Sequence, residues 1–183
     1  MDRPGVPDDW AELLTEFDAR IGRGRAMGGE TRLARLRDRA RLNAREQIAA
    51  LCDADSFMEL GTLAGGLGHG AQAAAPADAL VGGIARIDER TVVVGAEDFS
   101  VQGGSIGFAT AANRLRFARL ARQERGRLVM LLDGAGERAS NALSRYPYAP
   151  NDMQELALLS GLVPSIAVVS GSSAGHGAVT ALL

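Results

Sequence analysis

The sequence has no lysine, and all 20 of its basic residues are arginine. Schiff-base catalysis, a P-loop lysine and a lysine base are therefore excluded within this chain. Cysteine is nearly absent as well, because Cys52 is the only one, which excludes an intrachain disulfide framework and favours a reducing, cytoplasmic location. No apolar run reaches the length of a membrane span and no charged-then-apolar leader opens the chain, so we expect no membrane partner.

The charge balance is close to neutral, with a net charge of −2 and an isoelectric point near 5.7, so no global field recruits nucleic acid. Hydrophobic residues make up 46% of the sequence, enough for the core of one domain or part of one. Arginines nevertheless crowd between residues 32 and 45, either as a solvated helical face, which is the commoner outcome, or as a site for a polyanion such as a nucleotide phosphate. Aromatic residues do not interleave with them, so RNA binding has no support. The crowded residues are Arg32, Arg35, Arg37, Arg39, Arg41 and Arg45.

Helical signals dominate the N-terminal third. Apolar spacing predicts a helix over 8–22, with Asp9 and Glu12 as a capping box, and a flexible joint over 23–30. The pattern from 31 to 51 is helical but interrupted. Asn43 followed by Glu46 is a second capping box and predicts a new helix from Ala44 to Leu51. Residues 61–79 are rich in glycine and alanine without periodicity and are predicted to be a loop.

Repeated strand–turn–helix units follow a β-hairpin, whose strands are expected at 81–87 and 91–96 with a turn at 88–90. Strands begin at Val92, Leu128 and Ile166, separated by 36 and 38 residues, a period that predicts parallel strands. Helices are expected over 109–125 and 152–162, and the strand over 166–169 reads as buried.

A glycine-rich turn is predicted at the end of each parallel strand, where open α/β proteins bind ligands. The backbone N–H groups of the second and third turns together are expected to form an oxyanion hole. The turns are Gly103-Gly104-Ser105, Asp133-Gly134-Ala135-Gly136 and the stretch from Gly171 to Gly177.

Other motifs in these turns are weaker. Residues 171–175 satisfy the G-x-S-x-G pattern of serine hydrolases, with Ser173 as nucleophile, but of the required acid and histidine only His176 follows. The glycine fingerprint of dinucleotide-binding proteins does not continue to its third glycine. No metal site is predicted, because His69 and His176 have no cysteine or carboxylate at ligand spacing.

Several segments jointly resemble the N-terminal part of the carboxyltransferase (beta) subunits of biotin-dependent acyl-CoA carboxylases, of the propionyl-, acetyl- and methylcrotonyl-CoA carboxylase type. Asp133-Gly-Ala-Gly-Glu-Arg138 stands at the place of that family's D-S-G-G-A-R motif, and residues 171–178 at the place of G-P-C-A-G-G-A. The resemblance runs in order from about residue 27 to the end. The other segments are Met27-Gly-Gly29, Asn43-Ala-Arg-Glu46, Ile48–Leu51, Asp55–Leu60, Glu97–Gly107 and Ser160–Pro164.

The resemblance implies an α/β fold, a crotonase-like (ClpP/crotonase) spiral of ββα units. Because the chain stops inside the third unit's helix, we expect this spiral to be truncated. The implied organisation is an N-terminal helical segment over 1–60, a loop over 61–79 and an incomplete N-terminal carboxyltransferase domain over 80–183.

The implied chemistry is transfer of a carboxyl group from carboxybiotin to the α-carbon of an acyl-CoA, with the enolate oxygen held by backbone N–H groups. The resemblance also implies a biotin carboxylase or biotin carrier partner and a homo-oligomer in the full-length protein, with this chain alone inactive. Carried over by position, the catalytic residues are Ala135, Gly136, Gly175 and His176. The substrate-binding residues are Gly103, Gly104, Ser105, Gly134 and Ala174, joined by Arg41 and Arg45 for the phosphates of CoA.

Two positions depart from the family's glycines, namely Ala135 and His176, where a positive φ would be strained. The ring of His176 is expected to narrow the acyl pocket or to cap its turn. Three other functions stay open: a malonyl-thioester decarboxylase β-type subunit, which shares the Gln102–Gly107 turn, a hydratase or isomerase using Glu137 as acid/base, and a non-catalytic CoA-binding fragment. The hydratase leaves the segment from Asn43 to Leu60 unexplained.

Overall fold

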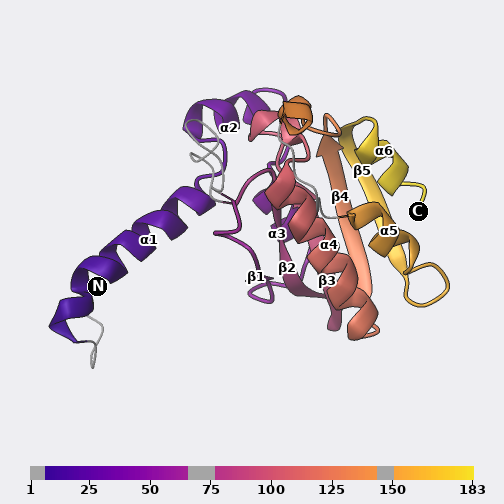
Figure 1. Ribbon diagram of the computed structural model, residues 1–183, viewed down its shortest axis with the longest axis horizontal. Coiled ribbons are helices and arrows are strands. Elements are labelled where there is room, and N and C mark those ends of the chain that lie inside the picture. The colour runs from indigo at the N-terminus through magenta and orange to yellow at the C-terminus, as the bar shows by residue number, and fades with distance from the viewer. Residues whose placement is uncertain (1–6, 66–76, 144–150) are drawn as a thin grey trace.

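The computed structural model describes residues 7–65, 77–143 and 151–183 and centres on one five-stranded sheet with the order β1-β2-β3-β4-β5 (Figure 1). The first three strands pair antiparallel, and β3, β4 and β5 run parallel, as the 36- and 38-residue spacing predicted. The strands are β1 (Met58–Glu59), β2 (Leu80–Ile87), β3 (Arg90–Glu97), β4 (Arg127–Gly134) and β5 (Ser165–Ser173).

The predicted hairpin is present, and its turn is tight because only Asp88 and Glu89 separate the paired residues Ile87 and Arg90. Both turn residues have positive φ, 48° and 65°, as a two-residue turn between twisted strands requires. The carboxylate of Asp53 accepts both of their backbone N–H groups, at 3.0 and 2.8 Å. This contact compensates for the missing Asn-Gly sequence.

The capping box of the third α-helix is confirmed: the Asn43 side chain accepts the Glu46 backbone N–H, and the Glu46 carboxylate accepts that of Asn43. The box predicted at Asp9 and Glu12 is wrong, because a 3₁₀ turn precedes the first helix and puts Trp10 at its N-cap, without a capping side chain. The helices are η1 (Asp8–Trp10), α1 (Ala11–Arg25), α2 (Glu30–Arg37), α3 (Ala44–Leu51), η3 (Gln102–Gly104), α4 (Phe108–Gln123), η4 (Ala139–Leu143), α5 (Asp152–Ala157) and α6 (His176–Thr180).

Two of these helices depart from their predicted bounds by at least three residues. Helix α1 continues to Arg25, so the joint predicted over 23–30 shrinks to residues 26–29. Helix α5 ends at Ala157 instead of residue 162, because the chain then turns toward β5. Helix α1 projects away from the rest of the molecule (Figure 1), and its apolar residues Trp10, Leu13 and Phe17 are 55%, 64% and 48% exposed.

The sheet buries a hydrophobic cluster on each face. On one face Phe117 and Ala118 of α4 and Leu156 of α5 pack on the sheet, and on the other Ala44 and Ile48 of α3 do so. Helix α3 packs on this sheet and β1 pairs with β2, so the N-terminal segment is part of the same fold. The division into segments 1–60, 61–79 and 80–183 stays a prediction, and residues 66–76, with His69, lie outside the described residues.

The strand predicted over 166–169 is present as part of β5, but its predicted burial is wrong. Ile166, Val168 and Val169 are 57%, 44% and 54% exposed, because β5 lies at the edge of the sheet. The strand also runs on to Ser173, so Gly171 is a strand residue. A Cβ at Gly171 would lie 2.1 Å from the Oδ1 of Asp133, so glycine there leaves room for that carboxylate.

Candidate functional site

The three glycine turns meet at the carboxyl ends of the parallel strands. We define the first turn as residues 102–105, the second as 133–136 and the third as 174–177. The backbone N–H of Ala135 donates to the carbonyl oxygen of Gly103 at 3.0 Å, which joins the first turn to the second. A Cβ on Gly104 would lie 2.3 Å from the carbonyl oxygen of Asp133, so these backbones touch directly.

The second and third turns also touch. The N–H of Ala174 donates to the carbonyl oxygen of Gly134 at 3.3 Å, and a Cβ on Gly136 would lie 2.6 Å from the carbonyl oxygen of Ala174. Only glycine permits this approach. The structure therefore brings together Gly103, Gly104, Gly134, Gly136 and Ala174, which the sequence placed in three separate segments.

Backbone N–H groups remain available where the second and third turns face each other. Within the described residues, the N–H groups of Gly136, Gly175 and His176 donate to no protein acceptor. The N–H of Ala135 is occupied by Gly103, so the structure removes Ala135 from the predicted set of free donors. Unpaired N–H groups on two touching turns are the type of donor from which oxyanion holes are built.

The φ angles in these turns explain why alanine and histidine are tolerated at positions 135 and 176. Gly136 has φ 82° and Gly175 has φ 50°, and both conformations favour glycine. Neither Ala135 nor His176 has a positive φ, so the strain expected at these two departures does not arise.

The arrangement does not support a serine nucleophile. Ser173 is the last residue of β5, and its Oγ is buried without a hydrogen-bond partner among the described residues. The sharp bend that would expose a nucleophile lies two residues later, at Gly175, which has φ 50° and ψ −117°. Glycine has no side chain that could act as the nucleophile. The ring of His176 is bonded elsewhere.

Two carboxylates hold the ring of His176. Its Nδ1 lies 3.1 Å from the Oε2 of Glu137, and its Nε2 lies 3.0 Å from the Oδ2 of Asp152. Sequence spacing did not indicate these partners, because they are 39 and 24 residues away. The hydrogen bond that the ring donates to Asp152 is the largest cause that raises the pKa of His176 above 6.5, and Glu137 adds to it, whereas burial and Arg114 oppose them.

Asp152 belongs to a buried network of charges that reaches the second turn. The guanidinium of Arg114, fully buried, donates from Nε to Asp152 at 2.6 Å and from Nη1 to Glu97 at 2.9 Å. Glu97 in turn accepts the backbone N–H of Asp133 at 2.8 Å. Burial alone would raise the pKa of Asp152, but His176 and Arg114 outweigh it and lower the pKa. Burial raises the pKa of Glu97.

The predicted phosphate-binding arginines have internal partners instead. Arg45 forms a bidentate ion pair with Glu59, both bonds 2.8 Å long, and Arg41 pairs with Asp133 while its guanidinium lies 4.9 Å from the Phe99 ring. The Arg41 and Asp133 pair thus links the arginine cluster to the second turn. Neither guanidinium is a free anion receptor in this structure.

A cavity of about 330 Å³ nevertheless lies among other members of the arginine cluster and borders the first turn. Within the described residues, Arg35 and Arg39 have no ion pair, and Arg32 donates only to the carbonyl oxygen of Ser100, at 3.3 Å. The sequence spacing of 32, 35 and 39 is helical, but in the structure Arg39 lies beyond α2, in the turn that follows Arg37. The cavity is lined by Arg32, Arg35, Leu36, Arg39, Phe99, Ser100, Gln102 and Gly103.

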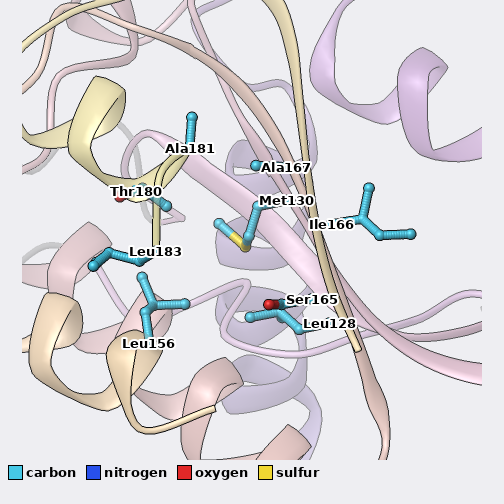
Figure 2. Close-up of a pocket in the computed structure, with 9 residues that line it drawn as sticks. All are labelled: Leu128, Met130, Leu156, Ser165, Ile166, Ala167, Thr180, Ala181 and Leu183. Atoms are coloured by element: carbon cyan, nitrogen blue, oxygen red, sulfur yellow. The ribbon is translucent and has the colours of Figure 1, made fainter. Parts of the chain in front are cut away.

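A second hollow, of about 60 Å³, lies between β4, β5, α5 and the C-terminal residues (Figure 2). Leu128, Met130, Leu156 and Leu183 give it an apolar lining, and no titratable side chain contributes. The hollow is thus no site for acid–base chemistry. Among the described residues, no group of three or more histidine, cysteine or carboxylate side chains could hold a metal ion, and no helix there is long and apolar enough to cross a bilayer.

Residues 35–183 match the family model of the carboxyl transferase domain. Curated relatives include the methylmalonyl-CoA decarboxylase subunit alpha of Veillonella parvula, 33% identical over 167 residues, and the propionyl-CoA carboxylase beta chain of Cereibacter sphaeroides, 32% identical over 170 residues. Each alignment covers 90% of this chain but only 32% and 33% of those relatives. The chain thus spans about a third of their length.

Solved structures agree with the sequence relatives. A transcarboxylase 12S hexamer, crystallised with methylmalonyl-coenzyme A, superposes with a TM-score of 0.80 at 26% identity, covering 96% of this chain and 35% of that one. A single-chain, multi-domain long-chain acyl-CoA carboxylase gives a TM-score of 0.74 at 29% identity, covering 93% and 18%. These neighbours have the crotonase fold of carboxyltransferases, so the predicted fold class is confirmed.

Proposed function

Because this chain belongs to the carboxyl transferase domain family, we propose that it binds an acyl-CoA and stabilises the enolate of its thioester during carboxyl transfer. The observation that carries the proposal is the set of unpaired N–H groups at Gly136, Gly175 and His176, on two turns in direct contact. A thioester oxygen seated between these turns gains hydrogen bonds as it becomes negative. That preference for the charged form is what lowers the barrier to proton loss.

In the proposed reaction the α-carbon of the acyl group loses a proton, and the electron pair left behind delocalises onto the thioester oxygen. The N–H groups hold that charge in place. The N–CO₂ bond of carboxybiotin, carried by a partner, would break to supply the CO₂ to which the α-carbon forms a bond, and the ureido nitrogen left behind would take up the proton. No described residue is assigned to hold the biotin. Gly103, Gly104, Ser105, Gly134 and Ala174 are proposed to shape the floor on which the thioester lies.

The phosphates of CoA are proposed to bind in the arginine-lined cavity, not at Arg41 and Arg45. Among the described residues Arg35 and Arg39 form no ion pair, and a guanidinium offers several donors in a planar fork that suits phosphate oxygens. Gly103 lines the cavity and also accepts the N–H of Ala135. A CoA bound at the arginines would therefore begin beside the first turn and reach the facing second and third turns.

Decarboxylation of a malonyl-type thioester is the second candidate, favoured by the 33% identity to the methylmalonyl-CoA decarboxylase subunit. It needs the same enolate, formed by loss of CO₂ instead of a proton. Binding of CoA without turnover is the third, since the chain spans about a third of its relatives. A biotin carboxylase or biotin carrier partner, assembly into a homo-oligomer and a cytoplasmic location belong to the proposal as well.

The test is calorimetric binding of CoA and of propionyl-CoA to the 183-residue chain, followed by turnover. Tighter binding of propionyl-CoA than of CoA is expected if the turns receive the thioester. Carboxylation of propionyl-CoA with carboxybiotin would identify the carboxylase, loss of CO₂ from methylmalonyl-CoA the decarboxylase, and binding with neither reaction the binding-only chain. If neither ligand binds to the folded chain, the proposal is wrong.

A further inference from the structure

We infer that His176 is a positioning residue of the proposed oxyanion hole: its ring, protonated on both nitrogens, holds the third turn against the second by bridging Asp152 and Glu137. This inference rests on the proposed function, because the turns matter only if an oxyanion binds between them. It was not accessible from the sequence, where the ring was expected to narrow a pocket or cap its own turn.

The geometry of the ring requires two donors. Each nitrogen faces a carboxylate, at 3.1 Å from Glu137 and 3.0 Å from Asp152. A neutral imidazole has one N–H and one lone pair. It could donate to only one of these carboxylates, and its lone pair would then point at the oxygens of the other. The imidazolium satisfies both, so the folded chain favours the doubly protonated ring.

The groups around the ring keep that charge. Asp152 on α5 and Glu137 after the second turn face the positive charge of the ring directly, and both lower the free energy of the imidazolium. Arg114 on α4 acts in the other direction but is itself paired with Asp152 and Glu97. Glu97 on β3 also feels the charge of His176. The hydrogen bonds to two carboxylates outweigh Arg114 and burial, which is why the pKa of His176 is raised.

Glu137 and His176 are each joined to a proposed donor by a single peptide link. Glu137 directly follows Gly136, and His176 directly follows Gly175 and carries a donor N–H itself. Glu137 is held in turn by Asn141, whose Nδ2 donates to its Oε1, and by its bridge to Ile106. The N–H of Ala174 already joins the third turn to Gly134 of the second, and the ring adds a side-chain contact between His176 and Glu137.

Deprotonation of His176 would break one of the two contacts. The tether then weakens, the spacing of the N–H groups is less well defined, and the thioester oxygen gains less from them. Because CoA itself has no thioester oxygen, the ratio of its dissociation constant to that of propionyl-CoA isolates this effect. We expect that ratio to fall about threefold to tenfold as the pH rises through the titration of His176, on the order of 1 kcal/mol.

The experiment combines NMR and binding. With His69 replaced by Gln, His176 is the only histidine, and ¹⁵N-labelled imidazole shifts report its protonation directly. The titration midpoint of His176 should lie above pH 6.5, and Glu137→Gln should move this midpoint to lower pH, together with the fall in the binding ratio. Glu16→Gln is the matched control. Glu16 lies on α1, its side chain is 56% exposed like that of Glu137, and it forms one ion pair. It should move neither.

Two results would overturn the inference: a His176 midpoint at or below 6.5, or a binding ratio that does not change through that midpoint. Asp152→Asn, if it folds, must lower the midpoint as well, and Glu137→Gln decides alone if it does not. Failure of the proposed function looks different. Propionyl-CoA would then bind no better than CoA at any pH, while the NMR titration still decides whether the ring is clamped.

Discussion

Ala135 donates its backbone N–H to the carbonyl oxygen of Gly103, 3.0 Å away. This bond fixes the second glycine turn against the first, and it uses up the donor that directly precedes Gly136. The next donor along the chain, Gly136 itself, is left unpaired beside the third turn. The N–H of Ala135 therefore has a structural role, whereas the N–H of Gly136 is proposed to act in catalysis.

Gly136→Ala is expected to disrupt the proposed hole. The residue has φ 82°, and an added Cβ would lie 2.6 Å from the carbonyl oxygen of Ala174, so the two turns must separate. The backbone conformation alone costs about 1–2 kcal/mol. Calorimetry should show that propionyl-CoA binds no better than CoA, while CoA binding is retained.

The matched control is Gly126→Ala, because a Cβ there meets nothing within 4 Å and φ is not positive. This variant should be as stable as the parent or about 0.4–1 kcal/mol more stable. A Gly136→Ala chain that keeps the full preference for propionyl-CoA would contradict the assignment of this turn.

The arginines should divide into two classes. Arg45→Ala removes both bonds to Glu59, whose side chain is only 14% exposed, and should lower the free energy of unfolding by about 1.5–3 kcal/mol. Arg35→Ala and Arg39→Ala should leave stability within about 0.5 kcal/mol but weaken CoA binding by about fivefold each. Urea unfolding and calorimetry measure the two effects.

Arg116→Ala is the control for this comparison, since Arg116 is exposed on α4, away from the cavity. It should change neither stability nor CoA affinity. If Arg35 and Arg39 can both be removed without loss of affinity, the phosphates of CoA bind elsewhere.

Stability should depend on pH through His176. Its pKa is raised in the folded chain, so its contribution is fully present below pH 6.5 and is lost as the pH rises through the folded value. The contribution of Asp152 to stability has the opposite pH dependence. Because its pKa is lowered in the folded chain, this contribution is present above pH 3.8 and is lost on acidification. The stability lost in His176→Gln should therefore be greatest between these limits and shrink on the alkaline side, as urea unfolding across pH will measure.

The pH series is measured in the His69→Gln background, in which His176 is the only histidine. A constant difference between the parent and His176→Gln on both sides of pH 6.5 would mean that the ring contributes by packing and not by its charge.

The hairpin turn should be improvable. Asp88 and Glu89 adopt φ 48° and 65°, which costs a non-glycine residue about 1–2 kcal/mol, whereas glycine loses about 0.5–1 kcal/mol in unfolded-state entropy. Glu89→Gly should raise the free energy of unfolding by about 0.5–1 kcal/mol. Glu124→Gly, at an exposed position with φ −84°, should not raise it, and thermal unfolding of both variants is the check.

The sequence predicted features that depend on neighbours along the chain. The Asn43 and Glu46 capping box joins residues three apart, and the hairpin joins strands separated by two residues. The glycine turns follow their strands directly. The Asp9 and Glu12 box failed because a 3₁₀ turn shifted the helix start to Trp10, a local competition that the pattern does not reveal.

Contacts between distant segments could not be read from the sequence. The pattern predicts that 166–169 is a strand but not that it lies at the sheet edge, so the burial of Ile166 was misjudged. The pattern also shows that arginines cluster in one segment. It does not show that Arg45 pairs with Glu59 or that Arg41 pairs with Asp133.

The sequence by itself determined the parallel strands, their glycine turns and a family whose chemistry uses backbone donors, because each follows from short-range pattern and motif. Only the tertiary structure decided that Ala135 is bonded while Gly136 is free, and that Glu137 and Asp152 enclose His176 from 39 and 24 residues away. The physical reason is that a hydrogen bond or an ion pair depends on separation in space. Folding alone brings these groups within 3.1 Å.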